Sequence, residues 1–286
     1  MFFHRKELIA DVKVEAPDAR FAQLLLEQFG GATGELSAAL QYWVQSFHVD
    51  TPSIRDMLQD IALEEFSHLE VVGRLIEAHT RRTQETEAFN STLFAIRGVG
   101  PHFLDSQGSA WSAKYLNEGG DVVRDLRADL AAEAGARQTY EALIKLAPDE
   151  GTKKALVTLL TREISHTHMF MEALRGLGKL SDPFFGNVPP DSTVNLYFNL
   201  SQDGQIRGPW NTSPAFQFVE NPQPMGHDSV SQPAGPPVQG QTQVPPGGME
   251  WATSTARPIP PSGDVSEPCM NAAVPQQPSV MADKKR

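Results

Sequence analysis

The sequence carries two short stretches that decide the fold, EEFSH at residues 64–68 and REISH at residues 162–166. Each stretch places a glutamate three residues before a histidine. Residues three apart share one face of a helix, so the two side chains of each pair can reach the same point. A single pair of this kind is often only a solvated helix face. The argument for a metal site therefore depends on how the two copies are related.

The two stretches belong to a longer internal repeat. A glutamate, a second glutamate and a histidine recur in the same order with a single offset of 98 residues. The matching sets are Glu35, Glu65 and His68 in the first half, and Glu133, Glu163 and His166 in the second. Tyr42 maps onto Tyr140 by the same offset. We interpret the repeat as an internal duplication of a helical hairpin.

Apolar spacing and the positions of prolines predict four helices, at about residues 19–48, 52–81, 121–146 and 148–177. The short connections around Pro52 and Pro148 predict two antiparallel hairpins, and the glycine-rich residues 83–120 join them. Three glycines, Gly30, Gly31 and Gly34, interrupt the first helix, and we expect a close packing contact there rather than a break. The expected fold is an all-α core, a ferritin-like four-helix bundle with one long crossover.

Proline content divides the chain. Only Pro17, Pro52, Pro101 and Pro148 precede residue 183, and the rest of the 22 prolines follow. Long helices do not tolerate that density, because each proline removes a hydrogen-bond donor. We expect a bundle domain with an N-terminal arm at residues 1–182 and an extended, mostly irregular C-terminal arm at 183–226, in which residues 194–198 and 215–219 form either short strands or extended arms. Residues 227–286 are expected to be a Pro/Gly-rich tail, largely irregular or disordered.

Composition argues against several classes of partner. The net charge of −11 repels nucleic-acid phosphates and anionic lipid headgroups, so neither is an expected partner. The single cysteine, Cys269, excludes an internal disulfide and the cysteine-based zinc and iron–sulfur sites. No apolar run has the length of a signal peptide or a membrane-spanning helix. These features predict a cytoplasmic protein.

Four glutamates and two histidines in this arrangement are typical of a dimetal carboxylate centre in a helical bundle. Buried carboxylates repel one another, and two divalent cations neutralise four of them. Oxygen ligands with one imidazole per metal suit manganese or iron better than copper or zinc. The alternative is that the six residues face solvent, but Glu35 lies between the apolar Ala32 and Leu36. Tyr42 is either a core residue or a hydroxyl that bonds to solvent at the metals.

Several motifs resemble the manganese catalase family over most of residues 1–226. They are the Met-Phe-x-His opening, Gly34-Glu35, Glu64-Glu65-x-x-His68, Glu133 with Ala136-Arg137, Arg162-Glu163-x-x-His166, and Glu220-Asn221-Pro222 with Met225-Gly226. The resemblance implies a non-haem enzyme that disproportionates hydrogen peroxide to water and dioxygen, with two manganese ions per subunit cycling between the (II,II) and (III,III) states. It also implies a homohexamer whose C-terminal arms are exchanged between subunits.

The resemblance also assigns roles to the repeated residues. Glu35 and His68 would bind one manganese, and Glu133 and His166 the other. Glu65 would bridge both ions. Glu163 would not be a ligand but would hydrogen-bond to metal-bound solvent and move protons. The repeat in sequence therefore does not require a symmetric site.

Two further features follow from the same comparison. Some family members bind calcium at subunit contacts, and the matching positions here are Asp56, Asp60, Asn199, Ser201 and Asp203. A helix cap and a turn explain those residues equally well. Many members have an arginine directly before the glutamate of the third helix, where this chain has Ala132, which leaves the geometry of the substrate channel open. The tail after Gly226 has no match.

Two other classes of protein compete with the catalase interpretation. One is a different dimetal carboxylate protein, such as a ferritin, a rubrerythrin or an oxygenase. Rubrerythrin needs cysteine pairs, and ferritins usually end without a long proline-rich tail. The other class is a structural or coat protein that retains the fold and uses its arms for assembly.

Overall fold

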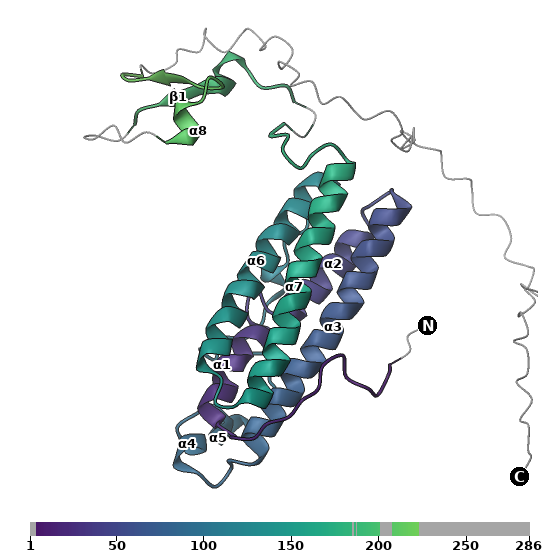
Figure 1. Ribbon diagram of the computed structural model, residues 1–286, viewed down its shortest axis with the longest axis vertical. Helices are drawn as coiled ribbons and strands as arrows, with labels where there is room; N and C mark the ends of the chain where they lie inside the picture. The colour runs from purple at the N-terminus through teal and green to yellow at the C-terminus, as the bar shows by residue number, and fades with distance from the viewer. Residues whose placement is uncertain (1–3, 185, 187, 201–207, 223–286) are drawn as a thin grey trace, which may run out of the picture. The chain divides into compact units, whose positions relative to one another are not determined.

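The computed structural model describes residues 4–184, 186, 188–200 and 208–222, and the chain divides into two units, Met1–Val188 and Pro189–Arg286. The first unit is a helical bundle. Its long helices are α1 (Ala19–Gly30), α2 (Glu35–Ser46), α3 (Pro52–Arg81), α6 (Val122–Leu146) and α7 (Glu150–Gly176). The crossover between α3 and α6 carries the short helices α4 (Glu87–Asn90) and α5 (Phe94–Arg97) and a 3-10 turn at Ala113–Tyr115. The fold is the one expected from the sequence (Figure 1).

The first predicted helix is broken, which corrects the expectation of one continuous element. α1 ends at Gly30, the backbone of Gly31 is extended, and the chain becomes helical again at Glu35. The expected close contact is also present, because a Cβ on Gly30 would lie 2.6 Å from the carbonyl oxygen of Leu104. The break places Glu35 in the first turn of α2, where the partial positive charge of a helix N-terminus stabilises a carboxylate.

Acidic side chains start the helices. Asp18, Asp121 and Asp149 each accept hydrogen bonds from backbone N–H groups in the first turn of α1, α6 and α7. Pro52 occupies the first turn of α3, where its missing N–H costs nothing. Such caps stabilise a helix end by roughly 1 kcal/mol each. They fix where each helix begins and hence which residues face inward.

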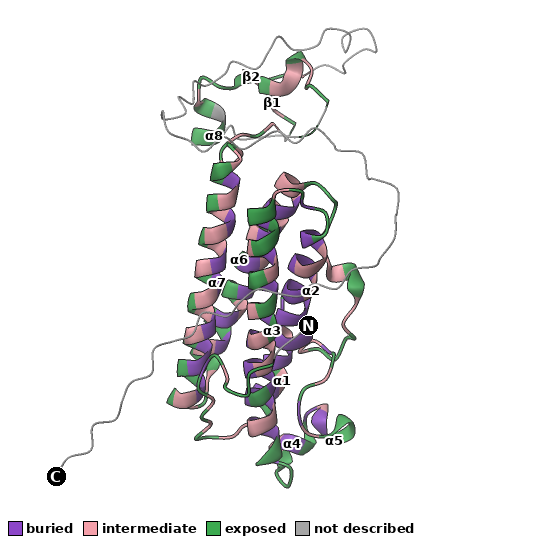
Figure 2. Cartoon of the chain, turned by 90° about the vertical axis from the view of Figure 1, so that its right-hand side faces the viewer, coloured by how far each residue is buried: buried purple, intermediate pink, exposed green. Residues whose placement is uncertain are grey.

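The bundle has two apolar clusters with a polar layer between them. α2 packs against α3, α6 against α7, and α1 and α2 both contact α6. One cluster contains Leu25, Val72, Leu75, Leu156 and Leu159, and the other contains Ile54, Leu58, Ile61, Phe170 and Leu174. On both α3 and α7, residues of the two clusters flank the Glu-x-x-His positions. Buried residues follow the inward faces of these helices (Figure 2).

The second unit contains a small parallel pair of strands. β1 (Leu196–Phe198) pairs with β2 (Gln217–Val219) in the register Leu196 to Gln217 and Phe198 to Val219. A 3-10 turn at Ser192–Asn195 precedes β1, and the short helix α8 (Pro209–Thr212) precedes β2. Of the two alternatives expected for these runs, short strands or extended arms, the structure shows strands. Residues 227–286, predicted as an irregular tail, lie outside the described residues.

Within the part of the chain that the structure describes, none of the helices combines the length and the apolar character needed to span a bilayer.

Candidate metal centre

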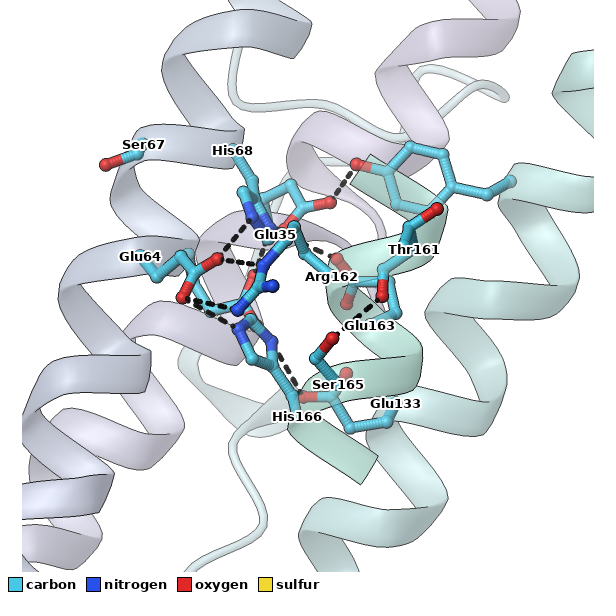
Figure 3. Close-up of polar contacts among 12 residues, drawn as sticks. Glu35, Glu64, Ser67, His68, Glu133, Thr161, Arg162, Glu163, Ser165 and His166 are labelled. Carbon is cyan, nitrogen blue, oxygen red and sulfur yellow. Dashed lines mark hydrogen bonds and ion pairs between the residues drawn. The ribbon is translucent and has the colours of Figure 1, made fainter. Parts of the chain in front are cut away.

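The six repeated residues converge in the polar layer of the bundle. Glu35 comes from α2, Glu65 and His68 from α3, Glu133 from α6, and Glu163 and His166 from α7. Each of the six is at most 1 % exposed. Figure 3 shows the labelled members of this group pointing toward one another from their four helices. The 98-residue repeat thus brings together a single buried cluster of carboxylates and imidazoles.

The donor atoms of these six residues fall into two overlapping groups, and Glu64 forms a third group with His68 and His166. One group contains Glu35, Glu65, His68 and Glu163, and the other contains Glu65, Glu133, Glu163 and His166. Within each group, the donor atoms lie within 4.8 Å of one another. Glu65 belongs to both groups: its Oε2 is 2.9 Å from His68 Nδ1, and its Oε1 is 2.7 Å from His166 Nδ1. This geometry suits two neighbouring cations joined by Glu65.

The electrostatics of the cluster are dominated by burial. Burial, reinforced by neighbouring carboxylates, raises the pKa values of Glu35, Glu133 and Glu163. Burial also acts on Glu65, but His68 and His166 outweigh it and lower the pKa of that carboxyl. For His166, burial is outweighed by Glu64 and Glu65, which raise its pKa to about 9. In the protein alone, protons therefore compensate the negative charge that metal ions would neutralise.

Unpartnered atoms test whether the residues fit metal ions. Within the described residues, several buried oxygen and nitrogen atoms of the cluster lack a hydrogen-bond partner. They are Glu35 Oε2, Glu65 Oε1, Glu133 Oε2, both carboxylate oxygens of Glu163, His68 Nε2, and both ring nitrogens of His166. An unsatisfied buried polar group costs about 1–3 kcal/mol. Such a concentration of unsatisfied carboxylate oxygens fits a pair of divalent cations better than an empty core.

Two tyrosines form hydrogen bonds between the two halves of the repeat. Tyr42 on α2 donates its hydroxyl to Glu133 Oε1 at 2.6 Å. Tyr140 on α6 donates in turn to Glu35 Oε1, which also accepts from Gln28 Nε2 at 3.1 Å. Both phenols are fully buried. Each tyrosine therefore holds the glutamate of the opposite helix, and Tyr42 contacts a candidate ligand directly. The two readings of Tyr42, core residue or polar group at the site, are compatible in this geometry.

Sequence reasoning quoted Glu64 as part of a motif but assigned it no role at the site. Its carboxylate lies 3.6 Å from His68 Nε2 and 3.3 Å from His166 Nε2, on the opposite side of each ring from Glu65. Arg162 Nε donates to Glu64 at 2.6 Å (Figure 3). Glu64 and Arg162 are themselves 98 residues apart, so they occupy equivalent positions of the repeat with opposite charges. That pairing was the signal available in the sequence.

The calcium prediction gains no geometric support. Asp56 and Asp60 are exposed on α3, and no cluster of three or more potential ligands among the described residues includes them. Asn199 lies in the second unit, where its N–H donates to the carbonyl of Val219. Ser201 and Asp203 lie outside the described residues. Ala132, in place of the family's arginine, is partly buried on α6 directly before Glu133.

Comparisons with known proteins identify the family of this chain. A family model described as manganese containing catalase matches residues 1–237, so the match extends beyond Gly226, where the sequence motifs had ended. The chain is 37 % identical over 223 residues to a probable manganese catalase of Clostridium acetobutylicum, covering 76 % of this chain and 98 % of that protein. It is 28 % identical over 263 residues to a manganese catalase of Bacillus subtilis, covering 82 % of this chain and 96 % of the relative. The crystal structure of KatB, a manganese catalase from Anabaena, is 74 % identical with a TM-score of 0.75, covering 78 % of this chain and 100 % of KatB. The chain belongs to the manganese containing catalase family.

Proposed function

We propose that this chain is a dimanganese catalase that disproportionates hydrogen peroxide to water and dioxygen. Glu35 and His68 would hold one manganese ion, Glu133 and His166 would hold the other, and Glu65 would serve both. The two buried donor groups share Glu65 and Glu163. The observation that carries this assignment is that the two oxygens of Glu65 face one histidine each. When bound, the manganese pair supplies a two-electron couple between the (II,II) and (III,III) states.

The remaining carboxylate of the cluster, Glu163, handles protons in this proposal. His68 Nδ1 lies 3.1 Å from Oε1 of Glu163 without the geometry of a hydrogen bond, and Oε2 has no hydrogen-bond partner among the described residues. Burial and the charge of Glu65 raise the pKa of Glu163, which favours a carboxyl that can accept and return a proton. Tyr42 orients Glu133 through its 2.6 Å hydrogen bond. The surrounding apolar clusters exclude bulk water from the site.

The proposal is tested by counting manganese in two histidine variants. His68→Ala and His166→Ala each remove one imidazole from one donor group, so each should lower the manganese content from two ions per subunit toward one or none. Inductively coupled plasma measurement on purified protein gives the count. His168→Ala, which changes an exposed histidine two residues after His166, is the matched control. Unchanged manganese content in both site variants would refute the ligand assignment.

The proposed assembly rests on the family resemblance and on exposed apolar side chains. We infer a homohexamer with residues 183–226 as an arm exchanged between subunits, acting in the cytoplasm. Apolar side chains exposed on the outer faces of α3 and α7 support burial against another subunit; they are Leu63, Phe66, Val157 and Ile164. Sedimentation velocity measures the assembly state. Calcium binding at Asp56 and Asp60 stays a prediction from the family resemblance alone.

A further inference from the structure

A buried glutamine of α1 contacts the first glutamate of the metal centre. Gln28 lies in the last turn of α1, is fully buried, and donates from Nε2 to Glu35 Oε1 at 3.1 Å. Tyr140 on α6 donates to the same oxygen. The other oxygen, Glu35 Oε2, has no hydrogen-bond partner among the described residues and lies 3.5 Å from His68 Nδ1. One oxygen of Glu35 is therefore held by two donors, while the other faces the histidine.

The second half of the repeat has no counterpart of the glutamine. Leu126 stands 98 residues after Gln28 and is packed in an apolar cluster. Glu133, the equivalent of Glu35, accepts at Oε1 from the hydroxyl of Tyr42. In the part of the chain that the structure describes, two amide or hydroxyl donors thus reach Glu35 and one reaches Glu133.

The break between α1 and α2 explains this difference. In each half, the two positions are seven residues apart. Seven residues rise about 10.5 Å along a continuous helix, so on α6 Leu126 lies two turns before Glu133. In the first half the chain turns at its glycines, and a Cβ on Gly34 would lie 2.6 Å from the carbonyl oxygen of Gln28. This tight turn brings the side chain of Gln28 within hydrogen-bonding distance of Glu35.

Two donors fix a carboxylate more completely than one. A single hydrogen bond holds one oxygen but leaves the carboxylate plane free to turn about it, whereas donors from two helices also set the plane. Each carboxylate oxygen offers two lone pairs, and Gln28 and Tyr140 use both on Glu35 Oε1. Only Oε2 then remains available to a cation. Partners that orient a metal ligand in this way are typically worth about 10- to 100-fold in metal affinity.

Packing alone does not account for Gln28. Within the described residues its Oε1 is buried without a partner, and an unsatisfied buried acceptor destabilises a folded protein. The leucine at the equivalent position has no polar atom to satisfy. We propose, on the basis of the dimanganese function above, that Gln28 is a positioning residue for Glu35. It raises the affinity for only one of the two manganese ions, the one that Glu35 and His68 would hold.

The variant Gln28→Met tests this proposal, because methionine has about the same length and no N–H to donate. Manganese-loaded protein is equilibrated with a series of chelator concentrations, and the manganese retained per subunit is counted. One of the two release steps should move to a chelator concentration about tenfold lower than in wild type, and the other should stay in place. A species with one manganese ion per subunit should therefore accumulate.

Gln45→Met is the matched control. Gln45 is also fully buried, donates from Nε2 at 3.1 Å and has an unpartnered Oε1 among the described residues. Its hydrogen bond goes to the carbonyl of Asn117 in the crossover rather than to the metal centre. Both substitutions remove one buried hydrogen bond, so a merely structural role would affect the two proteins alike. Gln45→Met should release both ions as wild type does.

Two histidine variants identify which ion is affected. In His166→Ala the ion at Glu35 and His68 remains, so adding Gln28→Met should weaken its retention about tenfold. In His68→Ala that ion is already lost, so the same addition should change nothing. Where a histidine variant retains no manganese, the series on the single variants decides.

Three results would overturn the role of Gln28. They are wild-type release of both ions from Gln28→Met, an equal shift of both release steps, and the same shift in Gln45→Met. Gln28→Leu, which installs the residue of the second half, carries the same prediction if the methionine variant fails to fold. Two ions retained in both His68→Ala and His166→Ala would instead overturn the ligand assignment of the proposed function.

Discussion

Glu64 illustrates how one side chain outside the metal ligands can control both of them. It faces Nε2 of His68 and of His166, while Nδ1 of each ring faces the bridging Glu65. Desolvation opposes ionisation of Glu64, but His166, His68 and Arg162 lower its pKa well below the usual range. A fixed negative charge at this position keeps the Nε2 protons in place and leaves Nδ1 free to bind a metal.

The variant Glu64→Gln should therefore weaken manganese binding. Glutamine has the same size but loses the charge that orients both rings, and outer carboxylates of this kind are worth about tenfold or more in metal affinity. Competition with a calibrated chelator measures the affinity. Glu70→Gln, on the same helix at a carboxylate paired with His4, provides the comparison and should bind manganese as wild type does. Equal affinities in all three proteins would show that Glu64 does not position the rings.

At the residue scale, the sequence predicted the cluster but not its contacts. A shared offset identified the six residues, because a duplicated hairpin repeats its functional positions. The crossed hydrogen bonds from Tyr42 and Tyr140 depend on how the helices rotate about their axes, which the offset does not specify. The role of Gln28 had no signal in the sequence, since its equivalent at the same offset is an apolar leucine, Leu126.

The helices of the bundle were predictable except at the glycine-rich residues between α1 and α2, where glycine conformation determines whether the helix continues. Caps and prolines located the starts of α3, α6 and α7. The break between α1 and α2 was not predicted, because glycines in a helical pattern are compatible with either a tight contact or an end. Here they do both: Gly30 approaches Leu104, and Gly34 caps α2 so that Glu35 begins it. The break has a functional consequence, since it orients Glu35.

His79 joins the N-termini of two helices. Its Nδ1 accepts from the N–H of Asp18, which caps α1, and its Nε2 is 3.1 Å from the hydroxyl of Thr152 in the first turn of α7. Nδ1 can accept only if the ring is neutral, so Nε2–H is the donor to Thr152. Burial lowers the pKa of His79 to about 4, against the charges of Asp149 and Asp18. Protonation therefore opposes folding at this junction.

Because of His79, the folded protein should become less stable as pH falls. Because the folded-state pKa lies below the ordinary 6.5, the stability from neutral His79 is complete above pH 6.5 and is lost as pH falls toward 4. The loss amounts to up to about 3 kcal/mol of the free energy of unfolding. The variant His79→Gln should be less stable than wild type at pH 7, and the difference should shrink by pH 4. Urea unfolding at several pH values measures it, with the exposed His168→Gln as control. A difference that does not change with pH would contradict the neutral junction.

The whole molecule follows from a duplicated hairpin with a long crossover and an added C-terminal segment. The change in proline content separated the helical part from the rest, and the two runs expected to be strands or extended arms pair as β1 and β2. What sequence patterning did not locate is the surface for assembly. The exposed apolar residues on α3 and α7 have no sequence spacing of their own, because the same helices also carry the buried apolar face. Their exposure becomes apparent only once the packing of the helices is known.

The central claim is that the buried cluster binds two manganese ions and turns over hydrogen peroxide. The most direct measurement combines metal analysis of the purified protein with oxygen-electrode recording after addition of peroxide. The account predicts two manganese ions per subunit and one dioxygen released for every two peroxides consumed. It also predicts loss of activity on chelation and recovery on addition of manganese. Protein fully loaded with manganese that releases no dioxygen from peroxide would contradict the account.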